Sequence, residues 1–361
     1  MLKLCMIAPV PPPYGGVANW VEIIKKEISR QNDIELDLIS TSVNKRLTDG
    51  RTTSNRVFYG IKNMLYSYIS LNKSIRSFAP EVVHITTSGG LGFFRDLLLL
   101  NILRKRNIKT VYHIHFGRTV LYEKENGRCW RQIREAVRLA DCTIVLDAKT
   151  YQLLKPYCNR IEKINNPIPL DGYPSQFQKS DNKIITYMGS ILKEKGVEEL
   201  LEGFAAFRMN APEYKLRMIG PGRPEYLDYL QKHYDCEKVR FYGEVSHNEA
   251  IKLLSETSIF ILPSYTEGFP NVVLEAMALG KCIIGTDVGA IPEILSDGAG
   301  IIIQPKDAGI ITSALKKVSD DEEMRINTSK IGFFKVRKQY GISESFKEYY
   351  KVWSELTTKQ F

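Results

Sequence analysis

Short apolar runs alternate with helical stretches along the whole chain, and this alternation restricts the possible folds more than any other feature. In the first half, strands are expected at 3–8, 34–39, 82–86, 110–115 and 142–146. In the second half, they are expected at 184–188, 215–219, 239–242, 259–262, 282–285 and 301–303. Helical patterns, such as those over 17–29 and 128–140, fill most of the gaps. Such alternation is typical of an α/β protein with parallel sheets.

The length of 361 residues exceeds what one hydrophobic core usually supports, so two domains are expected. Prolines and a glycine gather in the middle of the chain, at Pro167, Pro169, Gly172 and Pro174, which favours a linker. The predicted layout is a first domain over 1–168, a linker over 169–182 and a second domain over 183–340. Residues 341–361 are expected to form an amphipathic helix that either returns to the first domain or packs on the second. Two doubly wound parallel sheets would then face each other across a cleft.

The most informative segment, 267–275, has the sequence Glu-Gly-Phe-Pro-Asn-Val-Val-Leu-Glu. A helix that has Pro270 at its first position and stops near Gly280 aims backbone N–H groups at one point, which suits a phosphate. Glu267 and Glu275 flank that point with acceptors for the hydroxyl groups of a sugar or a ribose. A phosphate between two hydroxyl-binding groups describes a nucleotide sugar. The expected binding residues are Gly268, Phe269, Asn271 and Val272.

Residues 260–289 resemble the signature of glycosyltransferase family 4, in which the two glutamates also stand eight positions apart. That family comprises retaining enzymes with the GT-B fold, two Rossmann-like domains that face each other. The resemblance implies transfer from a UDP- or GDP-sugar, held mostly by the second domain, to an acceptor hydroxyl. Glu267 would hold a sugar hydroxyl and stabilise charge near the anomeric carbon, and Glu275 would accept hydrogen bonds from the ribose. The expected acceptor is a glycan or lipid-linked sugar in bacterial surface polysaccharide synthesis.

Lys195 precedes a glycine and a helix, which places an ammonium where a diphosphate would need it. The family pattern has an arginine soon after the first glycine of this segment and a lysine before the second. Lys195 matches the lysine, whereas Ser190 stands in the place of the arginine. Three explanations remain open: Ser190 donates a weaker hydrogen bond, Lys193 helps, or helix dipoles contribute more. Gly220 is expected to border the base pocket, although a plain turn explains it equally well.

His113 and His115 end a predicted strand and point to the same face of it. The resemblance implies that His115 contacts the donor sugar, and His113 is expected to give structural support. The loop over 11–17 contains Gly15 and Gly16, which allow the backbone to approach a ligand closely. The resemblance places Gly16 near the donor phosphate and the acceptor; a tight turn without a ligand is the alternative. A nicotinamide cofactor is not expected, because the third glycine of the dinucleotide fingerprint is missing.

The formal net charge of +9 suits an anionic partner, such as a phosphorylated substrate or an anionic membrane surface. Basic residues are in excess over 45–62, but no zinc-finger or zipper pattern occurs, so nucleic acid is not the expected partner. No Asp-X-Asp triplet occurs, and no bound metal is expected. Scattered cysteines, the lack of a signal-peptide pattern and the lack of a long apolar run favour a cytoplasmic enzyme, with peripheral contact to the membrane.

Two other functions fit part of this pattern. A sugar-nucleotide epimerase uses the same two-domain architecture and would convert its donor without an acceptor. A nucleotide-sugar binding protein with a decayed active site would explain the missing arginine. The presence of Glu267, Glu275, His115 and Lys195 together favours the transferase.

Overall fold

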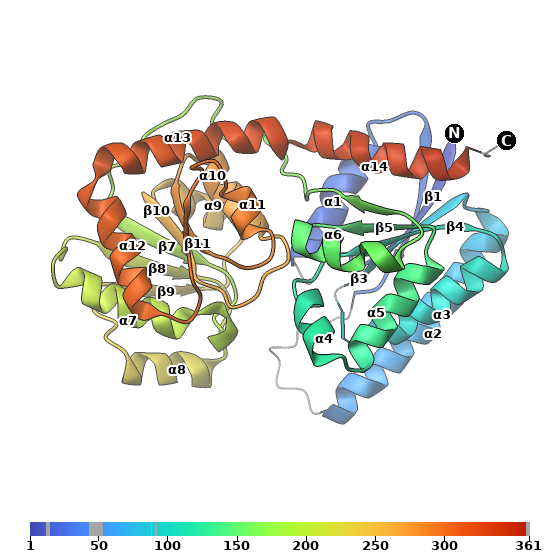
Figure 1. Cartoon of the computed structure of the whole chain (residues 1–361), viewed down its shortest axis with the longest axis horizontal. Coiled ribbons are helices and arrows are strands. Elements are labelled where there is room, and N and C mark those ends of the chain that lie inside the picture. The colour runs from blue at the N-terminus through green and yellow to red at the C-terminus, as the bar shows by residue number, and fades with distance from the viewer. Residues whose placement is uncertain (12–14, 43–52, 88, 91, 359–361) are drawn as a thin grey trace. The chain divides into compact units, whose positions relative to one another are not determined.

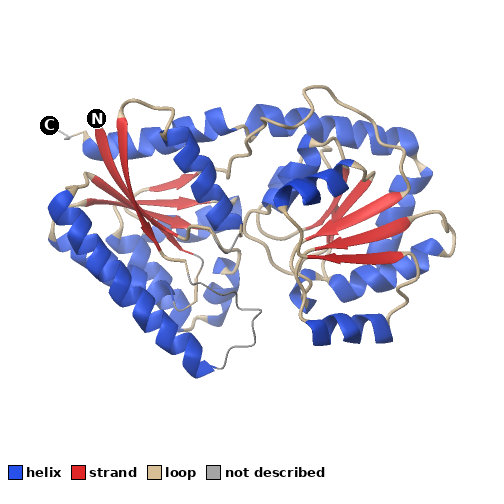
Figure 2. Ribbon diagram, turned by 180° about the vertical axis from the view of Figure 1, so that it is seen from behind, coloured by secondary structure: helices blue, strands red, loops and turns tan. Residues whose placement is uncertain are grey.

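The computed structural model describes residues 1–11, 15–42, 53–87, 89–90 and 92–358. The chain divides into two compact units: unit 1 comprises Met1–Pro169 with Ile342–Phe361, and unit 2 comprises Leu170–Gly341. Each unit contains one six-stranded parallel sheet with helices packed around it (Figures 1 and 2). This arrangement confirms the expected class, two doubly wound parallel-sheet domains. Residues 170–182, which the sequence predicts as a linker, belong to unit 2.

Unit 1 has the strand order β2-β1-β3-β4-β5-β6, and every neighbouring pair is parallel. Its strands are β1 (Leu2–Ala8), β2 (Ile34–Ser40), β3 (Val82–Thr87), β4 (Lys109–Ile114), β5 (Cys142–Val145) and β6 (Ile161–Lys163). Its helices are α1 (Gly16–Ile28), α2 (Thr53–Ser77), α3 (Gly92–Lys105), α4 (Thr119–Glu125), α5 (Arg128–Leu139), α6 (Ala148–Leu154), η1 (Lys155–Tyr157) and α14 (Ile342–Thr357).

Two hydrophobic clusters cover the two faces of the unit 1 sheet. One cluster joins the sheet to α1 and α14 through Trp20, Ile24, Tyr349 and Trp353. The other joins it to α2, α3 and α5. Strands buried on both faces need nearly continuous apolar sequence, which is why the strands of this unit stood out as apolar runs. Helix α14 is therefore part of the core of unit 1, although it follows unit 2 in the sequence (Figure 1).

Unit 2 has the strand order β12-β11-β10-β7-β8-β9. Its strands are β7 (Ile184–Met188), β8 (Lys215–Ile219), β9 (Val239–Gly243), β10 (Ile259–Leu262), β11 (Cys282–Thr286) and β12 (Ile301–Ile303). Its helices are η2 (Lys193–Lys195), α7 (Val197–Arg208), α8 (Pro224–His233), α9 (His247–Ser255), α10 (Asn271–Ala278), α11 (Ile291–Ile294), α12 (Ala308–Asp320) and α13 (Glu322–Gln339). In the described part of the chain, no helix has both the length and the apolar composition of a membrane span.

Every strand range expected from the sequence coincides with an observed strand to within one residue at each end. Strand β6 was not predicted. It has three residues at the edge of the sheet, and all of them are at least partly exposed. Such a strand has no apolar run by which the sequence would reveal it.

Candidate functional site

The sheet of unit 2 reverses its strand order between β7 and β10. The chain runs outward from β7 through β8 to β9, and then returns to the other side of β7 with β10. In open α/β sheets, ligands bind outside the carboxyl ends of the strands at such a point of reversal. The loops that follow β7 and β10 carry Lys195 and Glu267. This edge of the unit 2 sheet is therefore the candidate site.

Lys195 and Glu267 form an ion pair at this point of reversal. Lys195 Nζ lies 2.5 Å from Glu267 Oε1, and the two side chains are 25% and 13% exposed. Ser264 Oγ donates a second hydrogen bond, 2.6 Å long, to the same oxygen. Partial burial strengthens this attraction relative to that of a fully exposed pair. Two donors thus fix the Glu267 carboxylate and keep the Lys195 ammonium beside it.

Ser264 is a site residue that sequence reasoning missed. Its side chain is buried and donates to Glu267, which lies three positions further along the chain. The sequence signal for this role was a serine placed just after β10 and shortly before Glu267. A short side chain at that position reaches the carboxylate because the loop between them turns back on itself.

Two glycines let the loops around this pair pack backbone against backbone. Gly196 has φ of +68°, and a Cβ there would lie 2.1 Å from the carbonyl oxygen of Pro263. Gly289 has φ of +55°, and a Cβ there would lie 2.2 Å from the carbonyl oxygen of Glu267. Any larger residue would meet both the backbone contact and the cost of a positive φ. The loops after β7 and β11 are therefore fixed against the loop that carries Glu267.

Helix α10 begins at Asn271, one residue later than the sequence predicts. Pro270 is its N-cap, with extended φ and ψ of −80° and 98°, so the assignment of Pro270 to the first helical position is wrong. The Pro270 carbonyl accepts the first hydrogen bond of the helix, as an N-cap carbonyl does. The predicted stop at Gly280 is confirmed: its φ is +70°, and the Lys281 amide donates to the Ala276 carbonyl, which is a Schellman motif.

The predicted phosphate-binding segment follows Glu267 directly in the chain. Asn271 and Val272 are the first two residues of α10. The Gly268 carbonyl accepts a hydrogen bond from the loop after β11, and Phe269 is buried. The segment is thus held from one side, while the amino end of a helix provides partial positive charge.

Glu275 lies inside α10 and is only 6% exposed. Burial raises the pKa of its carboxyl group from 4.5 to about 7. A side chain buried in this way does not serve merely to support an exposed helical turn. A buried carboxylate is costly unless hydrogen-bond donors meet it, and the hydroxyl groups of a ligand are such donors.

Ser190 and Gly220 lie on neighbouring loops, after β7 and β8. The Ser190 carbonyl accepts a hydrogen bond of 2.7 Å from the Tyr187 hydroxyl. Gly220 has φ of +136°, and a Cβ there would lie 2.1 Å from the carbonyl oxygen of Gly189. Close packing of the two loops therefore explains Gly220 without any ligand.

In unit 1, Gly16 is the first residue of α1, one residue before the helical pattern expected from the sequence, and Gly15 is the N-cap. A Cβ added to either glycine would meet no atom within 4 Å, so the backbone here is open to the approach of a ligand. Residues 12–14 of the same loop lie outside the described residues, as do residues 45–52 of the basic stretch over 45–62.

His115 comes directly after β4 and is partly exposed, whereas His113 is buried within β4. The two imidazoles contact each other, with His115 Nε2 at 3.0 Å from His113 Nδ1. A third histidine, His84 on β3, was missed by the sequence reasoning; its Nε2 lies 3.3 Å from the same His113 Nδ1. Burial lowers the pKa of His84 and of His115 to about 3, so both rings are neutral at physiological pH. Unit 1 therefore presents a row of neutral imidazoles that ends at His115.

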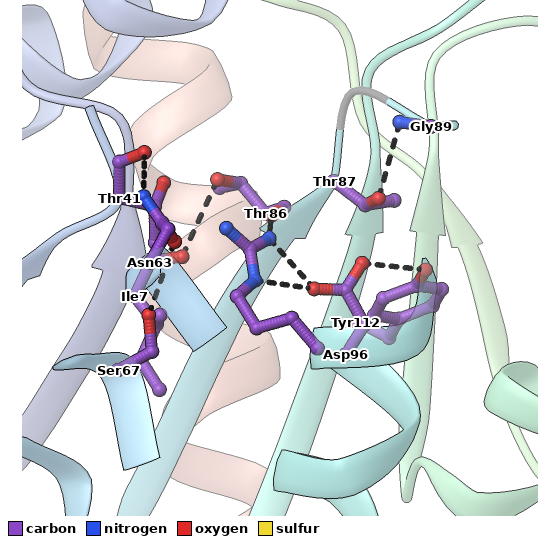
Figure 3. A network of polar contacts seen from close by, with 10 residues as sticks. Ile7, Thr41, Asn63, Ser67, Thr86, Thr87, Gly89, Asp96 and Tyr112 are labelled. Atoms are coloured by element: carbon purple, nitrogen blue, oxygen red, sulfur yellow. Dashed lines mark hydrogen bonds and ion pairs between the residues drawn. The ribbon is translucent and has the colours of Figure 1, made fainter. Parts of the chain in front are cut away.

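A second polar network lies at the carboxyl ends of β3 and β4, where α3 begins (Figure 3). The fully buried Asp96 pairs with Arg95 at 2.6 Å and accepts a hydrogen bond of 3.2 Å from the Tyr112 hydroxyl. Arg95 also donates to the carbonyl of Thr86. These contacts attach α3 to the two strands, and they compensate the buried charge of Asp96.

The structure thus brings Lys195, Glu267 and the segment 268–272 together at one edge of unit 2. Glu275 lies on the helix that this segment opens. His115 and Gly16 belong to unit 1, where each follows a strand at the carboxyl edge of that sheet.

Two family models match the chain. Residues 173–333 match the model described as glycosyl transferases group 1, and residues 14–171 match the model described as Glycosyltransferase Family 4. Together they cover most of both units, with β1 and α14 of unit 1 outside the two matches.

Individual proteins show the same likeness. The chain is 27% identical over 259 residues to a glycogen synthase of Mycobacterium tuberculosis, a match that covers 68% of this chain but only 62% of that protein. It is 32% identical to the capsular polysaccharide biosynthesis glycosyltransferase CapM of Staphylococcus aureus over 40% of this chain and 39% of that protein. The solved structure of Anabaena HepE in complex with UDP matches 98% of this chain and 100% of its own, with a TM-score of 0.72 and 13% identity.

Proposed function

Because the chain belongs to the group 1 glycosyl transferases with the GT-B fold, we propose that it moves a sugar from a nucleoside diphosphate sugar to an acceptor hydroxyl with retention of configuration. The observation that carries this proposal is the Lys195–Glu267 ion pair at the point of reversal in unit 2. A cation and a carboxylate held together suit a reaction in which negative charge leaves as diphosphate while positive charge develops at the anomeric carbon.

In this scheme, Lys195 exchanges its contact with Glu267 for the leaving diphosphate. The N–H groups of the first turn of α10, at Asn271 and Val272, receive a phosphate as well. Such donors stabilise charge best when they are fixed before the reaction begins. The glycine contacts of Gly196 and Gly289 supply that rigidity. Lys195 and the helix meet the diphosphate charge without a divalent metal, and the chain has no Asp-X-Asp triplet.

The Glu267 carboxylate then accepts a hydrogen bond from a sugar hydroxyl and stabilises the positive charge near the anomeric carbon. Glu275 accepts hydrogen bonds from the ribose, which satisfy its buried carboxylate. His115 is proposed to contact the donor sugar, and Gly16 the phosphate side of the donor. Ser190, in the place of the usual arginine, leaves more of the phosphate charge to Lys195 and to the α10 amides.

We propose a glycan or lipid-linked acceptor, in the synthesis of a bacterial surface polysaccharide in the cytoplasm. The names of the CapM and glycogen synthase relatives support polysaccharide synthesis, and the UDP complex of HepE supports a nucleotide donor of this type. A UDP- or GDP-sugar is the proposed donor.

A panel of UDP-, GDP- and dTDP-sugars tests the proposal. One nucleotide should stabilise the protein by about 2.7 kcal/mol at a hundredfold excess over its Kd, measured as a rise in the thermal unfolding midpoint. With an acceptor glycan, NMR of the first product should show the anomeric configuration of the donor. An epimer formed without an acceptor would support the epimerase instead. Nucleotide binding without turnover on any acceptor would support the decayed binding protein.

The ionisation of Glu275 provides a test of its proposed contact with the ribose. Since its pKa is about 7, the carboxylate is the minor form near pH 6 and the major form near pH 8. If the ionised form receives the ribose hydroxyls, nucleotide affinity should rise by about tenfold over that range. Glu275→Gln should abolish the rise, because the amide does not titrate.

The surface of α2 suggests how the protein reaches a lipid-linked acceptor. Ile61, Leu65, Tyr68 and Ile69 recur at helical spacing on one face, and each is between 41% and 65% exposed. The flanking cations Lys62, Lys73 and Arg76 are exposed as well. An apolar stripe with basic edges suits an anionic lipid surface, where it lies in the plane of the headgroups. We propose that this face of α2 contacts the membrane.

Vesicle sedimentation tests this contact. The protein should bind vesicles that contain phosphatidylglycerol more strongly than vesicles of phosphatidylcholine alone. Replacing Leu65 and Ile69 together by serine should weaken that binding by at least about tenfold, since apolar area is lost from the contact. Met209→Ser, at a still more exposed apolar residue of unit 2, is the control and should have no effect. Equal binding of both vesicle types would contradict the proposal.

A further inference from the structure

Six aromatic side chains meet between the sheet of unit 1 and its covering helices α1 and α14. Three are the histidines His84, His113 and His115 described above, and the others are Trp20, Tyr349 and Trp353. Trp353, near the end of α14, donates a hydrogen bond of 3.0 Å from its indole Nε1 to Nδ1 of His84. Trp353 and His84 are both fully buried.

This contact decides where the proton of His84 resides. An indole N–H is a donor only, so Nδ1 of His84 must carry a lone pair. A neutral imidazole has one proton, and that proton is then on Nε2. His84 Nε2 lies 3.3 Å from His113 Nδ1 and donates to it.

The same reasoning passes from His84 to the next imidazole. His113 Nδ1 receives a proton donor and must therefore be unprotonated, which leaves the proton of His113 on Nε2. That nitrogen is buried and has no hydrogen-bond partner among the described residues. A buried N–H without a partner costs about 1–3 kcal/mol. The other tautomer of His113 would avoid this cost, but it would aim its proton at that of His84.

The last member of the row is His115, whose Nε2 lies 3.0 Å from Nδ1 of His113. An unprotonated Nε2 would set two lone pairs against each other at this distance, so Nε2 carries the proton and shares the single lone pair of His113 Nδ1 with Nε2 of His84. The remaining nitrogen, Nδ1 of His115, is then an acceptor. His115 is partly exposed, and no partner for its Nδ1 occurs in the described part of the chain.

We propose that Trp353 is a positioning residue that sets the tautomer of His115 through His84 and His113, so that His115 offers Nδ1 as an acceptor to a ligand hydroxyl. The consequence for turnover rests on the proposed function, in which His115 contacts the donor sugar. The tautomers themselves follow from contacts inside unit 1 alone. The hydrogen bond made by one ring nitrogen of a histidine commonly fixes the protonation of the other. Here the hydrogen bond from Trp353, on the C-terminal helix α14, acts on His115 through His84 and His113.

The proposal is tested by NMR of protein labelled with ¹⁵N at histidine. The chain has only five histidines, so each signal can be assigned by single substitutions. In the native protein, His84, His113 and His115 should each show a protonated Nε2 and an unprotonated Nδ1 at neutral pH. A protonated Nδ1 on His84 or on His115 would overturn the proposal without any variant.

Trp353→Phe keeps an aromatic ring but removes the donor. The three histidines should then show ring-nitrogen shifts averaged between two tautomers, and turnover should fall by about tenfold, the loss of one hydrogen bond to substrate. Tyr349→Phe is the matched control: it removes a hydrogen bond to Trp20 from the same helix and cluster, but no contact of the histidine row. Its histidine shifts should stay native.

A Trp353→Phe protein with native unfolding behaviour and unchanged histidine tautomers would contradict the proposal. The NMR result does not depend on a sugar donor. If the protein transfers no sugar, the proposed function fails while the tautomer pattern is still measured. If transfer is found and Trp353→Phe changes neither the tautomers nor turnover, the positioning role fails alone.

Discussion

Lys195→Ala is expected to lower the rate of sugar transfer by about 10²–10³-fold, the usual effect of removing one fixed donor from a developing negative charge. The ammonium is held in place by Glu267 at 2.5 Å, so it is already at the edge of the sheet where the diphosphate is proposed to leave. Initial rates at saturating donor and acceptor measure this effect. Glu267→Gln should produce a loss of similar size, because an amide does not stabilise positive charge near the anomeric carbon.

Lys193 offers the matched control for that experiment. It lies two residues earlier in the same short helix, is 68% exposed and pairs with Glu198 at 3.2 Å. Lys193→Ala should change the rate by less than about threefold, since an exposed ion pair contributes little. Both lysine variants should unfold within about 3 °C of the native protein. A folded Lys195→Ala protein with native turnover would contradict the proposed role of the ammonium.

Gly289→Ala is expected to destabilise the protein by about 3 kcal/mol or more and to reduce transfer severely. The added Cβ would lie 2.2 Å from the carbonyl oxygen of Glu267, so the loop after β11 or the loop after β10 must move. Strain of this kind belongs to the few mechanisms by which single substitutions have large effects. The free energy of unfolding, from urea titration monitored by fluorescence, measures the first effect.

Gly243→Ala separates the two causes of the lost stability, the steric contact of the added Cβ and the strain of a positive φ. Gly243 also has positive φ, +70°, but a Cβ there would meet no atom within 4 Å. Only the backbone strain remains, and it costs about 1–2 kcal/mol. Equal destabilisation by the two substitutions would show that the contact with Glu267 contributes nothing and that the loops around the ion pair are not held rigid by Gly289.

The fold was predictable from the sequence because its signals are local. Parallel strands covered on both faces must be apolar along their length, and helices must present one apolar side. Two local features were not predicted. Strand β6 has too few residues to show a hydrophobic pattern. Whether Pro270 is the N-cap or the first helical residue depends on its ψ angle, which the sequence does not fix.

The candidate site was predictable to the extent that its residues lie near one another in the sequence. Glu267, Glu275 and the start of α10 lie in one short segment, and Lys195 has a glycine context of its own. The contacts that orient these groups were not predictable. Ser264 donates to Glu267 only because a loop turns back, and His84 meets Trp353 across 269 positions of sequence. Such pairs depend on tertiary packing, which local pattern does not record.

The membership of α14 in the core of unit 1 bears on how the protein is made. Translation delivers residues 1–169 first, but the Trp353 and Tyr349 side chains that complete this core are synthesised only after all of unit 2. On the ribosome, the second half can therefore reach its native state before the first half does. Until residues 342–357 emerge, the face of the sheet beside α1 is uncovered and exposed to chaperones and to neighbouring nascent chains.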